Sequence, residues 1–351
     1  MSVSIKREDF LRLLESAQAG LSPNRINEQD DCFVALGGFI YTFNEEIACR
    51  VPSPLGKATK GAIPADKLLD LLRKLKEDDL QISNGQGELL IKGKGRKAGI
   101  RMDPEVSLGV DAVEIPKAWN KLHPDFGDAV ATVGQCAAEK EADTRLTCVH
   151  VHPKWLQACS RFQLCRWPLK TGIGGDSGTL IRRDSIKHVS SLGMAEWAET
   201  ESWLHFRNAS GLVLSCRRYM EKYPPLSKHL EVEGEKCILP KGLAEAAEKA
   251  AIFSTENAGD KLVRIDLSPG KLVLRGQGIS GWYRETKKVK YEGRNLCFLI
   301  PPEILIDVVN KHSEVVVNES KLMAKTLQFT FVSCLDQPRT EDDAEGEGVE
   351  Q

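Results

Sequence analysis

The sequence lacks the features of an exported, membrane-embedded or disulfide-stapled protein. No stretch approaches the roughly 18 consecutive apolar residues that a membrane-spanning helix needs, and the first residues, MSVSIKREDF, carry charges where a signal peptide is apolar. The ten cysteines never form a Cys-x-x-Cys pair, which a zinc ribbon or a thioredoxin motif requires. We therefore expect a cytoplasmic protein with reduced cysteines in its core and no membrane partner.

Aromatic residues are scarce, at 6%, but hydrophobic residues make up 41% and charged residues 28% of the 351 residues, as in a globular protein with ample core. The formal net charge of −2 hides an asymmetry, because residues 336–351 hold seven acids and one Arg. Residues 1–335 therefore hold 47 Lys and Arg against 43 Asp and Glu, a charge of +4. We expect the acidic tail to be disordered and solvating.

The strongest pattern is an internal repeat. Three helical patterns lead with Phe10, Phe126 and Leu243, which are 116 and 117 residues apart. A second set of helical patterns follows isoleucines at positions 63, 181 and 300, which are 118 and 119 residues apart. In each repeat a hairpin-like stretch separates the two helices, and a second alternating stretch follows them. The order is thus helix, strands, helix, strands, three times over.

This repeat predicts an α+β fold of three domains, each with two helices on an antiparallel sheet. The predicted domains are 1–117, 118–231 and 232–335, followed by the tail 336–351, with linkers near 115–124 and 221–236. In the second helix of the first domain, Leu68, Leu69, Leu72 and Leu75 should face the sheet, with charged residues outward.

Motifs that suggest chemistry lack their required context. Gly-Asp-Ser-Gly at 175–178 resembles the nucleophile signature of trypsin-like proteases, but no segment resembles the histidine motif, so a hydrolase using Ser177 is the distant alternative to a glycine-rich loop. The sequence GQGISG at 276–281 matches a dinucleotide fingerprint but precedes a strand, which favours a hairpin turn.

His150 and His152 share a strand face, which suits a metal ion, but no further metal-ligating residue has a suitable spacing nearby. We expect no enzyme activity, no metal and no cofactor.

Basic residues on the predicted helices are the remaining signal. Acids such as Asp66 and Asp184 lie among them, so a solvated helix face with paired charges is the alternative for any one helix. Such a surface can hold a phosphate backbone through loose, salt-sensitive contacts without reading bases. The basic residues are Arg7, Arg12, Lys67, Arg73, Lys74, Lys76, Lys140, Arg182, Arg183, Lys187, Lys241, Lys249 and Lys311.

Over roughly residues 5–335 the chain resembles the bacterial DNA polymerase III beta subunit, the three-domain sliding clamp, including its phage and plasmid relatives. The family's Ala-Thr-Asp-Gly-hydrophobic-Arg-Leu strand motif stands here as 158–164, where Ala158 and Leu164 match outright. The run CRRYMEKYPPL is similar to the family's approach to its third domain. The resemblance implies a head-to-tail homodimer, a ring whose helices surround double-stranded DNA and which performs no bond chemistry.

In this family the clamp tethers a DNA polymerase and is opened by an ATP-driven clamp loader. The resemblance therefore implies a processivity factor in the cytoplasm, associated with the nucleoid. The alternative is a clamp-like interaction protein that modulates a host clamp or transcription without its own processivity role. The DNA-binding residues implied for the lumen are Arg7, Arg12, Arg25, Lys67, Arg73, Lys74, Arg182, Arg183, Lys187, Lys241 and Lys311.

The family's pocket for clamp-binding peptides implies a second set of residues, between the second and third domains. Cys159, Arg161 and Gln163 replace the Thr, Gly and Arg of the family motif, so we expect a pocket of altered shape and altered peptide preference. The implied pocket residues are Leu146, Cys159, Phe162, Leu164, Pro224, Thr330 and Val332.

Overall fold

The computed structural model describes residues 2–22, 24, 27–85, 87–175, 177–254, 256–257 and 260–338. The chain folds into two compact units. Unit 1 comprises Met1–Gln135, Glu139–Leu156 and Leu169–Tyr223, and unit 2 comprises Cys136–Ala138, Gln157–Pro168 and Pro224–Gln351. Each unit contains parts of more than one predicted domain, and the three domain boundaries stay a prediction. Most of the acidic tail, from 339 on, lies outside the described residues.

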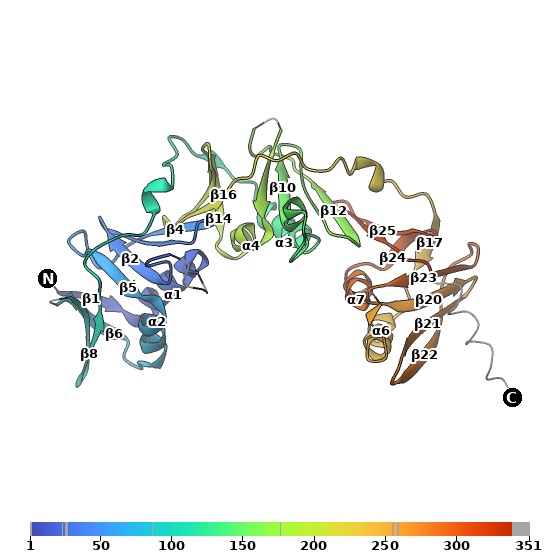
Figure 1. The fold of residues 1–351 in the computed structure, drawn as a ribbon, viewed down its shortest axis with the longest axis horizontal. Coiled ribbons are helices and arrows are strands. Elements are labelled where there is room, and N and C mark those ends of the chain that lie inside the picture. The colour runs from blue at the N-terminus through green and yellow to red at the C-terminus, as the bar shows by residue number, and fades with distance from the viewer. Residues whose placement is uncertain are drawn as a thin grey trace. The chain divides into compact units, whose positions relative to one another are not determined.

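All six predicted helical patterns form helices, which Figure 1 labels. The second helix of the second repeat is divided at Lys187, because the Ser190 and Ser191 hydroxyls donate to the carbonyls of Lys187 and His188 in a segment of low helix propensity. The helices of the described chain are α1 (Arg7–Ala17), α2 (Ala65–Lys74), α3 (Phe126–Gly134), α4 (Arg183–Ile186), α5 (His188–Ser191), α6 (Leu243–Ala251) and α7 (Pro302–Lys311).

Amphipathic spacing explains how the helices are held. In α2, Leu68, Leu69 and Leu72 are buried, as predicted, whereas Leu75 lies just beyond the helix and is partly exposed. Asp66 in the first turn and Arg73 and Lys74 in the last turn complement the helix dipole. Helices pack in pairs, α1 with α2 and α3 with α5 in unit 1, and α6 with α7 in unit 2.

The strands repeat one topology. In unit 1, β2 (Cys32–Leu36), β3 (Phe39–Phe43) and β4 (Ile47–Pro52) form a meander, and β5 (Gly61–Pro64) pairs back with β2. Unit 2 repeats this order with β20 (Val263–Ser268), β21 (Lys271–Gly278), β22 (Gly281–Lys288) and β23 (Leu296–Ile300). The corresponding strands of the middle repeat are β10 (Cys148–His152), β11 (Trp155–Cys159), β12 (Gln163–Pro168) and β13 (Thr179–Arg182), with β11 crossing from unit 1 to unit 2.

A second four-stranded pattern also repeats, with its first strand before the first helix of each repeat and its other three strands after the second helix. Its last strands, β8, β16 and β26, begin at residues 96, 213 and 330, a spacing of 117 residues each time. The three copies are β1 (Ser2–Lys6), β6 (Asp79–Asn84), β7 (Glu88–Gly93) and β8 (Arg96–Arg101); β9 (Asn120–Lys121), β14 (Met194–Glu199), β15 (Trp203–Asn208) and β16 (Val213–Arg217); and β17 (Glu235–Ile238), β24 (Glu314–Val317), β25 (Lys321–Lys325) and β26 (Thr330–Cys334).

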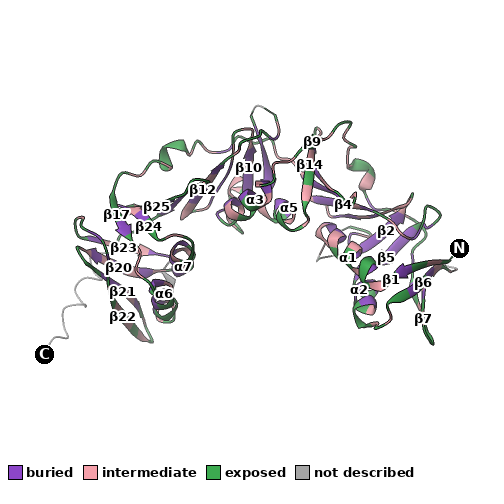
Figure 2. Ribbon diagram, turned by 180° about the vertical axis from the view of Figure 1, so that it is seen from behind, coloured by how far each residue is buried: buried purple, intermediate pink, exposed green. Residues whose placement is uncertain are grey.

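Antiparallel pairing connects the two patterns. In unit 1 β4 pairs with β16, and in unit 2 β12 pairs with β26. We call these pairs joint 1 and joint 2. The corresponding strands β22 and β8 are left at open edges of their own sheets, and exposed residues run along β22 in Figure 2. Two short strands, β18 (Glu256–Asn257) and β19 (Asp260–Lys261), form a separate ribbon.

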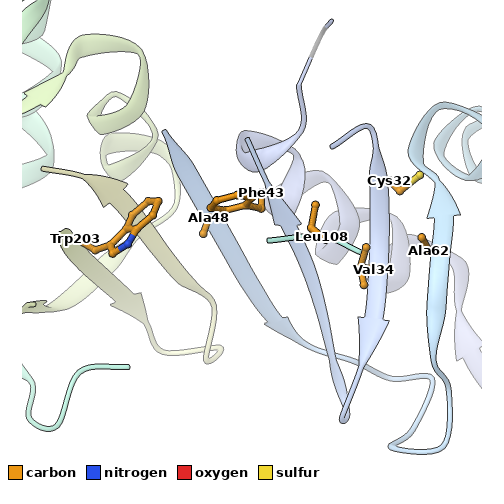
Figure 3. Close-up of a cluster of buried hydrophobic side chains, with 7 residues drawn as sticks. All are labelled: Cys32, Val34, Phe43, Ala48, Ala62, Leu108 and Trp203. Atoms are coloured by element: carbon orange, nitrogen blue, oxygen red, sulfur yellow. The ribbon is translucent and has the colours of Figure 1, made fainter. Parts of the chain in front are cut away.

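A cluster of buried side chains fixes the segment between β8 and β9, residues 102–119, to the sheet at joint 1, and we call this segment the first linker. Figure 3 shows Phe43, Leu108 and Trp203 among its members, and the Phe43 and Trp203 rings lie 6.1 Å apart. The Trp203 indole N–H donates to the carbonyl of Ala112 at 3.2 Å, which holds the linker over the strands. The whole cluster comprises Cys32, Val34, Phe43, Ala48, Ala62, Leu108 and Trp203.

The ten cysteines are thiols outside disulfides, as predicted, and eight of them are buried. The expectation that all lie in the core is wrong for Cys334, which is exposed, and only partly right for Cys297. Burial raises the pKa of the Cys49 thiol to about 12, so this side chain is a neutral apolar core group at physiological pH.

A buried histidine makes stability depend on pH. His205 is 1% exposed, and its ring nitrogens lie 2.8 Å from the Ser215 hydroxyl and 2.9 Å from the Thr200 hydroxyl. Burial lowers the His205 pKa to about 4, although the nearby Glu114 carboxylate opposes the shift. The neutral ring therefore stabilises the fold above about pH 6.5, the pKa of an unfolded histidine, and this contribution is lost as the pH falls toward 4.

We predict that His205 contributes roughly 3 kcal/mol to the loss of stability between pH 7 and pH 4. Denaturant unfolding of the wild type and of His205→Gln at several pH values measures this difference. A His205 imidazole that titrates near pH 6.5 by NMR would contradict the prediction.

Candidate nucleic-acid and peptide interfaces

Most of the predicted DNA-binding residues on the helices pair with acids. The Arg73 guanidinium lies 3.0 Å from the Glu15 carboxylate, and Arg183 lies 3.0 Å from Glu139. These are partly exposed pairs, which leave the side chains solvated and exchangeable. The other pairs are Arg12 with Glu8 at 3.5 Å, Lys67 with Asp66 at 3.0 Å, Lys187 with Asp184 at 2.8 Å and Lys311 with Asp307 at 2.6 Å.

Two of the predicted residues have structural contacts. The Arg7 side chain is only 15% exposed and donates to the carbonyl of Leu72 at 3.2 Å, so it ties the start of α1 to the end of α2. Arg182 lies 3.6 Å from Glu46. Burial opposes the charge on Arg182, but the hydrogen bond to Tyr219 and the Glu46 carboxylate outweigh it and raise the guanidinium pKa.

Lys74 and Lys241 are exposed, and neither has an ion pair within 4.0 Å among the described residues. Lys74 ends α2 and Lys241 precedes α6. Arg25 lies outside the described residues. The assignment of all eleven residues to DNA binding stays a prediction.

The helices of the described chain are acidic as a set. They hold eight Lys and Arg against eleven Asp and Glu, a net charge of −3. The overall composition conceals this balance, because residues 1–335 carry +4 and their strands and loops therefore carry +7. Tight electrostatic binding of a phosphate backbone is therefore not expected from the helices alone.

The predicted peptide-pocket residues gather at joint 2, except Leu146, which belongs to unit 1. Leu164 on β12 lies opposite Val332 on β26, and Arg166 lies opposite Thr330. Because side chains alternate along a strand, these four share one face. Leu164 and Val332 are 6% and 2% exposed, so the accessible surface comes mainly from Phe162 and Thr330.

The second linker extends this face in unit 2. The Arg166 guanidinium donates to the Gln157 side chain at 2.6 Å and to the Ser227 hydroxyl at 3.2 Å. Ser227 opens the short 3-10 helix Ser227–His229, three residues after Pro224. Cys159 is 6% exposed on β11. The structure thus brings Cys159, Phe162, Leu164, Thr330 and Val332 into one unit with Pro224, and their peptide role stays a prediction.

The motifs rejected from the sequence lack an active geometry in the described residues. His150 approaches the backbone carbonyl of Ser177, at 3.5 Å, and its ring stacks on Tyr223. His152 stacks on Trp155 at 3.8 Å. The GQGISG segment forms the hairpin between β21 and β22, as predicted. Within the described chain, no cluster of three or more metal-ligating side chains could hold an ion, and no helix has the length and apolar character to cross a membrane.

One recurring feature was missed from the sequence. IACRVP at 47–52 and QLCRWP at 163–168 share Cys-Arg-hydrophobic-Pro, and their arginines, Arg50 and Arg166, occupy the same register position of joints 1 and 2. Counted along the strand ladder from the turn between β20 and β21, Thr286 occupies the same position of β22, the corresponding strand of unit 2. The shared tetrapeptide was the available signal.

No protein-family model and no curated protein matches the chain in sequence. Solved structures do match in fold. The DNA polymerase III beta subunit of Pseudomonas aeruginosa superposes with a TM-score of 0.80 at 17% identity, covering 96% of this chain and 100% of that one. The beta subunit of Thermotoga maritima gives 0.81 at 15% identity, and the sliding clamp of Bartonella birtlesii, bound to griselimycin, gives 0.84 at 14%, each with the same coverage. The chain therefore has the fold of the DNA polymerase III beta subunits, the bacterial sliding clamps.

Proposed function

We propose that this protein is a DNA sliding clamp, a polymerase processivity factor that encircles duplex DNA as a head-to-tail dimer. The observation that carries the proposal is the fold match over 96% of the chain and the whole length of known clamps. Such a protein acts by enclosing DNA and needs no catalytic residue or cofactor. Its partners would be a DNA polymerase, a clamp loader and a second copy of itself, in the cytoplasm at the nucleoid.

The repeated topology supports ring closure. Joints 1 and 2 each pair the third strand of one pattern with the last strand of the other, and β22 and β8 are the two strands left without such a partner in their sheets. Pairing β22 of one copy with β8 of another makes the same joint a third time. Because the two surfaces differ, the contact is heterologous, and two copies close it into a ring with two such contacts.

The repeat also specifies the register of this third joint. Arg50 and Arg166 lie opposite Val213 and Thr330. Counted along the strand ladders from the preceding turns, the equivalent residues are Thr286 on β22 and Lys97 on β8, so Thr286 should lie opposite Lys97. By the same spacing, Trp282 should lie opposite Arg101. Trp282 is 71% exposed in the single chain and becomes the largest apolar group at this contact.

The retention of DNA would then come from enclosure, with weak backbone contacts that permit sliding. The net charge of −3 on the helices and the pairing of their Lys and Arg side chains with acids are consistent with weak binding of the DNA backbone.

Sedimentation velocity followed by retention on circular DNA tests the proposal. A species near 78 kDa, twice 38.9 kDa, that stays on closed circles and leaves after linearisation is expected.

We predict that reversing Arg73, Arg182 and Arg183 together to Glu shortens retention on circular DNA about tenfold at about 100 mM salt, because three phosphate contacts are removed. A matched control reverses Lys57, Lys94 and Lys117, which are exposed and lie outside the helices. Thermal melting checks that each variant folds. If both triple variants behave alike, these arginines have no specific DNA role.

The second candidate is a clamp-like interaction protein that modulates a host clamp or transcription. The acidic balance of the helices favours it, since such a protein need not hold DNA. A chain that remains near 38.9 kDa at all concentrations and is not retained on circles would favour this candidate over the processivity factor.

A further inference from the structure

A cavity of about 460 Å³ lies in unit 1 at joint 1, away from the predicted peptide residues of joint 2. Its wall combines strand residues of the joint with the linker that crosses it. The residues that matter are Tyr41, Arg50, Val113, Ile115, His205 and Val213. This volume is within the range of pockets that hold small ligands or a few side chains.

The cavity has a simple cause in the sequence. Ala48 and Ser215 lie opposite each other in joint 1, where joint 2 has Leu164 opposite Val332. The smaller pair leaves space on the same face. The linker cannot fill this space, because Leu108 and the Trp203 bond to Ala112 fix it over the neighbouring cluster.

Two of the polar side chains that line the cavity have hydrogen-bond partners, and the third has a buried donor group without an acceptor among the described residues. His205 bonds to Thr200 and Ser215, and the Glu114 carboxylate accepts from the Ser202 backbone N–H at 3.1 Å. The Arg50 guanidinium lies 4.8 Å from the centre of the Phe39 ring, and its buried Nε–H has no hydrogen-bond acceptor among the described residues. Arg50 therefore presents a donor that an entering acceptor would satisfy.

The cavity wall includes one highly exposed apolar side chain. Ile115, on the linker, is 78% exposed, which is unusual for an isoleucine beside a cavity. A ligand that covered Ile115 would extend beyond the cavity itself. This argues for an extended chain rather than a compact metabolite.

We propose that the joint 1 cavity is a second peptide site, which takes an apolar side chain between Tyr41, Val113 and Val213 and a carboxylate on Arg50. The choice of a peptide rests on the proposed function, because joint 2, with the same strand pairing, the same arginine position and a similar linker, is the proposed peptide site. The cavity itself lies within one unit and does not depend on ring closure.

The test is a titration with N-acetyl-leucyl-leucine as the free acid and as the C-terminal amide, followed by ¹³C-methyl NMR. We expect the methyl groups of Val113 and Val213 to shift with the acid at millimolar concentration, and at least tenfold weaker binding of the amide. Arg50→Met should weaken binding of the acid at least tenfold, and Ala48→Leu, which fills the cavity, should abolish these shifts. Thermal melting establishes that both variants fold.

The matched control is Arg166→Met, the same change at joint 2, which should leave the Val113 and Val213 shifts intact. Val332 reports on joint 2 independently. Unmoved Val113 and Val213 methyl groups, equal binding of acid and amide, or an Arg50→Met variant that binds normally would each overturn the proposal. Failure of the proposed clamp function would instead show in the solution mass and in the retention on circular DNA. Failure of the peptide site and failure of the clamp function are therefore distinguishable.

Discussion

Trp282→Lys is expected to convert the dimer near 78 kDa into a monomer of 38.9 kDa at micromolar concentration. Trp282 lies on the open strand β22, in the register position that Glu46 and Phe162 occupy at the joints within the chain. Its expected counterpart on β8 is Arg101, and an arginine can lie over the face of an indole ring. Replacing the indole with an ammonium group removes the apolar contact and places two like charges opposite each other.

The expected size of the effect follows from the buried area. A tryptophan that buries about 150 Å² contributes roughly 4 kcal/mol at 25 cal/mol per Å². The ring has two such contacts, so one substitution acts twice, and we expect the dissociation constant to rise more than about 100-fold even if most of this area term is offset by other costs of association. Sedimentation velocity across a concentration series measures the change.

Leu327→Lys is the matched control. Leu327 is as exposed as any large apolar side chain of the described chain, at 107%, and lies in the same unit, but its turn between β25 and β26 is not part of an open joint. It should leave the mass unchanged. A Trp282→Lys variant that dimerises like the wild type would exclude β22 as the closing edge.

The sequence predicted the repeat and most elements because both rest on local patterns. Apolar spacing located all six helical patterns, and a strand following GQGISG indicated a hairpin rather than a cofactor loop. The break at Lys187 was missed because it depends on hydroxyl bonds from Ser190 and Ser191 to the backbone, which compete with helix hydrogen bonds without changing the apolar period.

The candidate site was less predictable, for a physical reason. Arg73 and Arg183 were selected by residue type, but their acids, Glu15 and Glu139, come from other elements, 58 and 44 residues away. Pairing across such distances is set by tertiary packing and has no signal in a single sequence. The joint 1 cavity was missed for the same reason, since it requires β4 to meet β16.

The second large effect concerns the register of the closing joint. Thr286 is expected to lie opposite Lys97, and opposite charges that face each other stabilise a strand pair. We predict that Thr286→Glu strengthens dimerisation about tenfold, because a cross-strand pair contributes up to about 1 kcal/mol and the ring contains two of them. Sedimentation equilibrium at about 50 mM salt measures the gain, which should shrink at high salt.

A double-mutant cycle makes this prediction specific to the register. Lys97→Met removes the facing charge and is measured alone as the control. In the Lys97→Met background, Thr286→Glu should no longer strengthen the dimer. If the gain persisted there, the carboxylate introduced at position 286 would be acting through another group. β22 and β8 would then pair in a register other than the one that joints 1 and 2 repeat, and the contact of Trp282 with Arg101 would have to be reassigned with it.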